Sequence, residues 1–124
     1  HVGYGWVVIG LVLRGTAGVL GAPLGSVAIH ALTVGAIGSL TLGMMARVAL
    51  GHTGRMLVAP SSMTAAFVAI TLAALARVLG PWLAPEQYVV ALVAAGALWV
   101  LAFAVFLAVC APMLCGPRVD GRPG

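Results

Sequence analysis

The stretch HALTVGAIGSLTLGMMARVALGHTGR, residues 30–55, decides the fold of this chain. It places histidine, methionine and arginine in a run of apolar and small residues, and a bilayer is crossed by about 20 such residues of helix. Ionisable side chains are costly to bury in a membrane and are candidates for function where they occur. We therefore expect a membrane helix that carries a site rather than a bare anchor.

The composition extends this prediction to the whole chain. Of its 124 residues, 63% are hydrophobic and only 6% are charged, whereas soluble domains carry about 25% charged residues. The net charge is +4, and the six basic residues are arginines spread along the chain. Nucleic-acid binding needs a clustered basic face. We expect the lipid bilayer as a partner and no nucleic acid.

Four apolar runs predict an all-α fold, a polytopic transmembrane bundle of four spanning helices that forms one domain over residues 1–124. Glycine and proline separate the runs, Ser26 is the expected N-cap of the second helix, and Pro112 ends the fourth. The chain begins inside an apolar run without a leader, so we expect it to be the C-terminal part of a longer protein. The runs cover residues 3–20, 27–50, 63–79 and 86–111, with loops at 51–62 and around Gly80-Pro81 and a polar tail at 116–124.

The arginines predict the orientation of the bundle. Four spans put both termini and the second loop on one face, which receives Arg47, Arg55, Arg118 and Arg122. The other face receives only two arginines. Cytoplasmic loops carry the excess of arginine, so we expect both termini in the cytoplasm.

The second run has two distinct faces at about 100° per residue. Ala31, Gly35, Ser39 and Gly43 form a stripe of small residues, which lets helix backbones approach closely in a membrane. We expect protein on both sides of this helix and poor tolerance of leucine at Gly35 and Gly43. The opposite face carries His30, Val34, Ile37, Thr41, Met44, Val48 and His52.

The histidines and methionines of this helix are candidate ligands. His30 and His52 are about 33 Å apart along a helix, so they cannot hold one metal ion and mark opposite membrane faces. A histidine near a helix end is also an ordinary interfacial residue. Met44 is a possible metal ligand, although methionine more often fills gaps in packing.

Arg47 and Arg55 flank His52 and allow two interpretations. They can anchor the helix end at the membrane surface, or they can pair with carboxylates or phosphates of a cofactor. Haem propionates suit the second role, and haem iron is held by imidazole. An apolar slot for the macrocycle can be lined by Trp6, Trp99, Phe103 and Phe106.

Other chemistry finds little support in the sequence. Cys110 and Cys115 are read as small apolar residues, with a disulfide or metal role as the alternative. The two acidic residues lie in a turn and in the tail, and no phosphate-binding glycine loop follows a strand. We assign no enzymatic reaction.

Three segments resemble the NnrS family of bacterial membrane proteins: HALTVGAIG at 30–38, TLGMMAR at 41–47 and LGHTGR at 50–55. The opening HVGYGW and the closing PRVDGRPG are similar to the C-terminal third of the same family. The resemblance implies a multi-pass protein of the bacterial inner membrane that binds haem, expected to be b-type, and copper, and that acts in the response to nitric oxide and nitrosative stress. It also implies that the missing N-terminal spans, or another copy, are partners of this chain.

Because of the resemblance, we interpret the three histidines as candidate functional residues and not as ordinary interfacial ones. We expect His52 and His1, with Arg47 and Arg55, at an inner haem site, and His30, His52 and Met44 as metal ligands. Nitric oxide, the expected small-molecule ligand, is apolar enough to arrive through the bilayer. The alternatives are a transporter or permease subunit with a histidine-lined pathway and a purely structural subunit.

Overall fold

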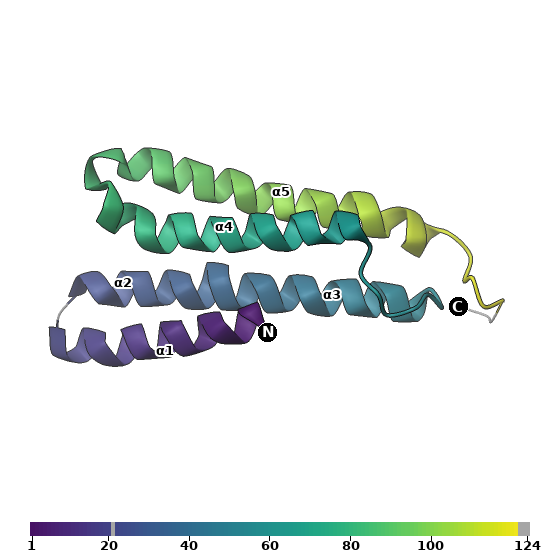
Figure 1. Ribbon diagram of the computed structural model, residues 1–124, viewed down its shortest axis with the longest axis horizontal. Coiled ribbons are helices and arrows are strands. Elements are labelled where there is room, and N and C mark those ends of the chain that lie inside the picture. The colour runs from purple at the N-terminus through teal and green to yellow at the C-terminus, as the bar shows by residue number, and fades with distance from the viewer. Residues whose placement is uncertain (21, 122–124) are drawn as a thin grey trace.

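The computed structural model describes residues 1–20 and 22–121, and within these residues the chain is helical with no strand (Figure 1). The all-α prediction is confirmed. The elements are α1 (Val2–Leu20), α2 (Ala22–His30), the π-helix η1 (Ala31–Ile37), α3 (Gly38–His52), α4 (Ser61–Leu83), the 3-10 turn η2 (Pro85–Gln87) and α5 (Tyr88–Cys115).

Four segments are long and apolar enough to cross a membrane, as predicted. The second span is continuous from α2 through η1 to α3, so one long helix covers residues 30–52 of the 30–55 stretch. The segments are Val2–Val19, Leu24–His52, Ser61–Leu83 and Pro85–Cys115.

Three predicted breaks are wrong. Ser26 lies inside α2 and is exposed, because this helix begins at Ala22. Pro81 lies inside α4, and Pro112 lies inside α5. A proline removes one backbone donor. Each therefore costs one intrahelical hydrogen bond to the carbonyl four residues back, and the helix continues for only two residues after Pro81 and three after Pro112.

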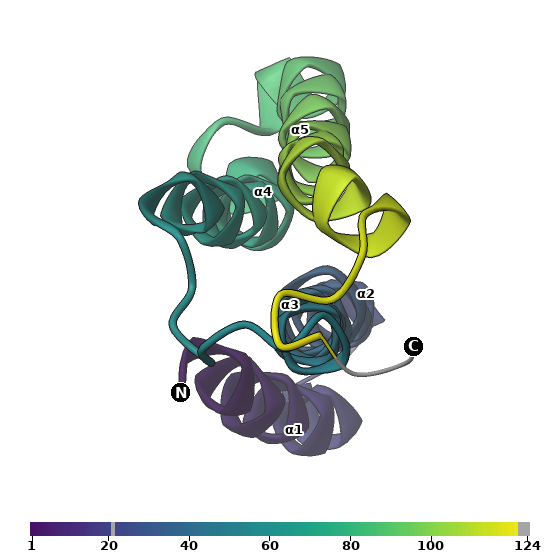
Figure 2. The same ribbon diagram turned by 90° about the vertical axis from the view of Figure 1, so that its right-hand side faces the viewer.

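The second span occupies the centre of the bundle. It lies between α1 on one side and the α4–α5 pair on the other (Figure 2), and it has the largest share of buried residues, narrowly ahead of α4. Two packed clusters hold it in place. One joins α3, α4 and α5 around Leu42, Ile70 and Phe106, and the other joins α1, α2, η1 and α4 around Trp6, Ala31 and Val78.

Small residues allow the close helix contacts that membrane packing relies on. Ala31, Gly35 and Ser39 are buried and Gly43 is half-buried, which agrees with the predicted stripe. A Cβ atom on Gly35 would lie 2.6 Å from the ring of Trp6 on α1. Any side chain at position 35 would therefore displace the Trp6 ring, so this contact requires glycine.

The opposite face of the second span differs from the prediction. His30 and Val34 are half-buried, whereas Met44, Val48 and His52 are exposed. The π-helical turn separates these two parts, since the Gly38 N–H donates to the Thr33 carbonyl five residues back. The prediction that protein encloses the second span on both sides is wrong within this chain. No described helix covers the part of this face that carries Met44, Val48 and His52.

Candidate functional site

The end of α3 fixes the position of His52. The Thr53 hydroxyl donates to the carbonyl oxygens of Ala49 (2.8 Å) and Leu50 (3.1 Å), and this closes the last turn. Gly54 then adopts a left-handed φ of +70°, which glycine adopts without strain. As a result, His52 stands in the last helical turn with an exposed imidazole.

The C-terminal tail returns to this helix end. The Val119 N–H donates a 3.2 Å hydrogen bond to the Thr53 carbonyl oxygen. Asp120 accepts two hydrogen bonds from Arg118, at 2.9 Å from Nε and 2.6 Å from Nη2. A Cβ atom on Gly54 would lie 2.7 Å from the Asp120 carboxyl carbon. Gly54 therefore leaves the space in which the carboxylate holds Arg118.

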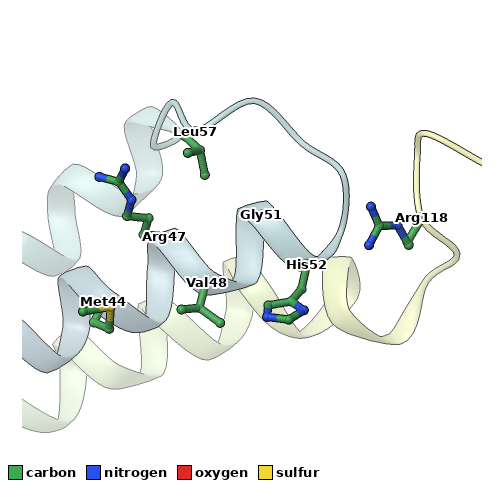
Figure 3. A pocket seen from close by; sticks show the side chains of 7 residues that line it. All are labelled: Met44, Arg47, Val48, Gly51, His52, Leu57 and Arg118. Carbon is green, nitrogen blue, oxygen red and sulfur yellow. The ribbon is translucent and has the colours of Figure 1, made fainter. Parts of the chain in front are cut away.

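These contacts complete a hollow of about 530 Å³ at the His52 end of the bundle, within the size range of ligand sites. Figure 3 shows Met44, Val48 and His52 following one another along α3, with Arg118 coming from the tail beyond the helix end. The residues that line the hollow are Met44, Arg47, Val48, Gly51, His52, Leu57 and Arg118.

The hollow combines an imidazole, two guanidinium groups and an apolar floor. Arg47 and His52 are five positions apart, so they leave α3 about 140° apart, and Figure 3 shows their side chains on different sides of the helix. The hydrogen bond to Asp120 raises the pKa of Arg118 above its ordinary value. Arg118 is therefore positively charged at any physiological pH.

The predicted site residues are brought together only in part. His52, Arg47 and Met44 line one hollow, but Met44 and His52 are eight positions apart, about 12 Å along the helix, and cannot ligate the same metal ion directly. Arg55 does not line the hollow. One of its terminal nitrogens is buried and has no hydrogen-bond partner among the described residues.

His1 does not lie at the same membrane face as His52, and that expectation is wrong. It borders a separate hollow with Gly3, Ser39 and Gly43, halfway along the second span, and Figure 1 shows the N-terminus at this level. The first helix of this chain is shorter than the second span, so its start does not reach the His52 end.

The opposite end of the bundle holds another polar hollow, of about 260 Å³. His30 of α2 lies there with Arg77 of α4 and Tyr88 of α5. The two histidines of the motif therefore lie at opposite ends, as predicted. The described arginines divide as predicted too. Arg77 lines the hollow with His30, and Arg14 lies in α1 four residues after Gly10, which packs against Leu32 near His30. Arg47 and Arg118 line the hollow with His52, Arg55 follows His52 by three residues, and Arg122 lies outside the described residues.

The family model described as NnrS protein matches residues 1–118. The chain belongs to the NnrS family. No curated protein and no solved structure matches it. Membership of this family, together with the four apolar helices, supports a membrane protein of the nitric oxide response.

The aromatic residues do not form the expected slot in this NnrS-family chain. Trp6 and Phe106 are buried in different clusters. Trp99 pairs with Phe103, at 4.5 Å between ring centroids. The described residues contain no group of three or more His, Cys, Asp or Glu side chains able to hold a metal ion, and Cys110 and Cys115 are free thiols, the first buried and the second exposed.

Arg118 is the site residue whose role the sequence analysis missed. The sequence predicted Arg118 only as one of the charges that orient the bundle, although it belongs to one of the segments that resemble the NnrS family. Helical periodicity gives no information about an irregular tail, and the pairing of the tail with Thr53 and Gly54 is visible only in three dimensions.

Proposed function

We propose that this chain provides one wall of a haem site in a membrane protein of the nitric oxide response. The single observation that supports the proposal is the hollow at the end of α3, because it joins the His52 imidazole to two guanidinium groups across an apolar surface. In this proposal His52 would hold the iron, and Arg47 and Arg118, whose long side chains line the same hollow, would pair with the propionates.

The chemistry of the lining fits one side of a haem. Imidazole is a common axial ligand of haem iron, and guanidinium groups bind carboxylates through paired hydrogen bonds. Val48 and Leu57 offer apolar surface for the macrocycle. Since His52, Met44 and Val48 are exposed, the opposite wall belongs to the spans outside this chain or to a second copy.

Each residue has a definite task in the proposed site. His52 would hold the iron from the last turn of α3, whose end is fixed by Thr53. Asp120 orients Arg118 through two hydrogen bonds, and Arg118 in turn orients the cofactor edge. The bound haem supplies an iron that can take a diatomic ligand, and nitric oxide reaches this depth through the bilayer without a polar tunnel.

Copper does not fit the described residues in the same way. His30, His52 and Met44 lie at separate places, and no cluster of three His, Cys, Asp or Glu ligands is present among the residues that the structure describes. A copper site in this protein needs further ligands from outside these residues. We therefore derive no step through copper.

We also propose that the protein resides in the bacterial inner membrane with the His52 end in the cytoplasm. Three of the five described arginines, Arg47, Arg55 and Arg118, lie at that end, and arginine is enriched in cytoplasmic segments. The proposed haem then lies near the cytoplasmic surface, with its propionates toward the arginines.

An absorption spectrum of the purified protein tests the haem proposal. The full-length protein is produced in cells supplied with a haem precursor and is purified in detergent. A Soret band, with a haem-to-protein ratio near one by the pyridine haemochrome assay, supports the proposal. A folded protein that stays colourless, also after incubation with haemin, contradicts it.

A further inference from the structure

The polar hollow at the His30 end is separate from the proposed haem site and contains a fixed cation. The Arg77 guanidinium lies over the ring of Tyr88, with 5.6 Å between its central carbon and the ring centroid. One terminal nitrogen of Arg77 donates a 3.4 Å hydrogen bond to the Tyr88 hydroxyl oxygen. Helices α4 and α5 therefore hold this charge in a defined place.

Among the residues that the structure describes, the charge of Arg77 has no partner of opposite sign. The chain has two acidic residues, Glu86 and Asp120. Asp120 pairs with Arg118 near the His52 end, and Glu86 is exposed in η2 and does not line the hollow. An arginine inside a membrane span is costly unless something compensates its charge. A ligand with a negative charge would provide that compensation.

The neighbours of Arg77 are hydrogen-bond donors. The Tyr88 oxygen accepts a bond from Arg77, so its own proton remains available to a ligand. The Ser26 hydroxyl and the His30 ring line the same hollow, and both groups can donate. Four side chains from three helices thus surround a volume of about 260 Å³ without a carboxylate among them.

Two further features suit a ligand from the membrane surface. Trp82 lines the hollow and is 56% exposed, and tryptophan is enriched at the depth of lipid head groups. Arg77 also borders a second, apolar hollow of about 340 Å³ that is lined by Val34, Leu92 and Trp99 among others. A phosphate group in the polar hollow would have space for an acyl chain beside it.

We propose that the Arg77 hollow binds a phosphate-type oxyanion, carried either by a lipid head group or by a free anion. Arg77 supplies the charge, and Tyr88, Ser26 and His30 supply hydrogen bonds. The proposal does not depend on the haem site, because the two hollows share no residue.

Titration calorimetry on the delipidated full-length protein in a neutral maltoside detergent tests the proposal. The probes are inorganic phosphate and a short-chain phosphatidylglycerol. Saturable binding of phosphatidylglycerol alone identifies the lipid source, binding of phosphate alone identifies the free anion, and binding of both supports one site open to either. Saturable binding of neither probe overturns the proposal.

Variants identify the residues that bind. Arg77→Gln removes charge-assisted hydrogen bonds and is expected to weaken binding about tenfold or more. Tyr88→Phe removes one neutral donor and is expected to weaken binding about fivefold. Arg14→Gln, which changes an exposed arginine of α1 that lines neither hollow beside Arg77, is the matched control and should leave binding unchanged.

The site is also rejected if Arg77→Gln binds like the wild type, or if Arg14→Gln weakens binding as much as Arg77→Gln does. Should Arg77→Gln not yield monodisperse protein, Tyr88→Phe decides in the same way. Unchanged affinity in a folded Tyr88→Phe protein then counts against the site.

Discussion

The backbone N–H of Val119 donates to the carbonyl oxygen of Thr53 at 3.2 Å. This bond ties the end of the chain to the end of its central helix. It brings Arg118 to the hollow that His52 lines, and Gly54 leaves the space that the Asp120 carboxylate occupies. Two segments that are distant in the sequence therefore form one candidate site.

The Asp120 carboxylate should act on the haem through Arg118. An Asp120→Asn change removes the negative charge and one of the two acceptor oxygens, so that at most one hydrogen bond from the guanidinium remains. We expect haem to dissociate faster by about two- to tenfold. Transfer of haem to apomyoglobin measures the rate. Glu86→Gln, which changes the other acidic residue, is the control; an equal effect in both variants argues against a positioning role.

This effect should not depend on pH in the ordinary range. Asp120 raises the pKa of Arg118, so the stabilisation from the charged guanidinium is lost only when the pH rises through that elevated value, far above the physiological range. We expect the ratio of dissociation rates between Asp120→Asn and wild type to be constant from about pH 6 to 9. A ratio that changes severalfold over this interval contradicts the assignment to Arg118.

Arg47 should contribute to haem retention by its charge. Arg47→Gln is expected to weaken haem binding about five- to tenfold, since one guanidinium–carboxylate contact is lost. The dissociation constant from haemin titration of the apoprotein reports the change. Arg55→Gln is the informative comparison, because Arg55 lies outside the hollow. A larger loss of haem affinity in Arg55→Gln than in Arg47→Gln contradicts our assignment of Arg47 to the haem site.

Gly35 and Gly43 should differ, although the sequence pattern treats them alike. A Cβ atom on Gly35 meets the Trp6 ring at 2.6 Å, whereas a Cβ atom on Gly43 finds only Phe67, at 3.8 Å. We expect Gly35→Ala to destabilise the protein by about 1–3 kcal/mol and Gly43→Ala to be neutral or slightly stabilising. The loss of helical circular dichroism as the SDS concentration rises measures the stability of both variants. Equal stability of the two variants contradicts the packing described for α1.

Labelling of introduced cysteines tests the orientation. Thr53 is a poor reporter because it is 4% exposed, whereas Met56 is 78% exposed in the same loop. In a Cys115→Ser background, Met56→Cys should resist an impermeant maleimide in intact cells and react after the membrane is opened. Leu83→Cys, 79% exposed at the other end, should react in intact cells. The reverse pattern shows that the His52 end faces the periplasm.

Much of the fold could be predicted from the sequence, because membrane spans and small-residue stripes are local patterns. The small stripe predicted the close approach of α1 at Gly35. The π-helical turn at Ala31–Ile37 was missed, since its composition does not differ from that of an α-helix in a membrane. A helical wheel therefore places His30 and His52 on one face, although His30 is half-buried and His52 is exposed.

The candidate site could be predicted only in part. Met44 and His52 follow from helical spacing and Arg47 from its place beside His52 in the sequence, and all three line one hollow. The position of His1 along the axis of the bundle depends on how α1 packs lengthwise against the second span, and no local sequence pattern encodes this. The contribution of Arg118 depends on the contact of an irregular tail with Thr53, and that contact has no periodic signal.

The haem-to-protein ratio of His52→Ala, compared with His1→Ala, tests the central claim most directly. Both variants remove one exposed imidazole, but only His52 lines the hollow with Arg47 and Arg118. The account predicts that His52→Ala loses most of its haem or shows a shifted Soret band, while His1→Ala keeps the wild-type ratio and spectrum. Full haem occupancy and an unaltered spectrum in His52→Ala would contradict the claim.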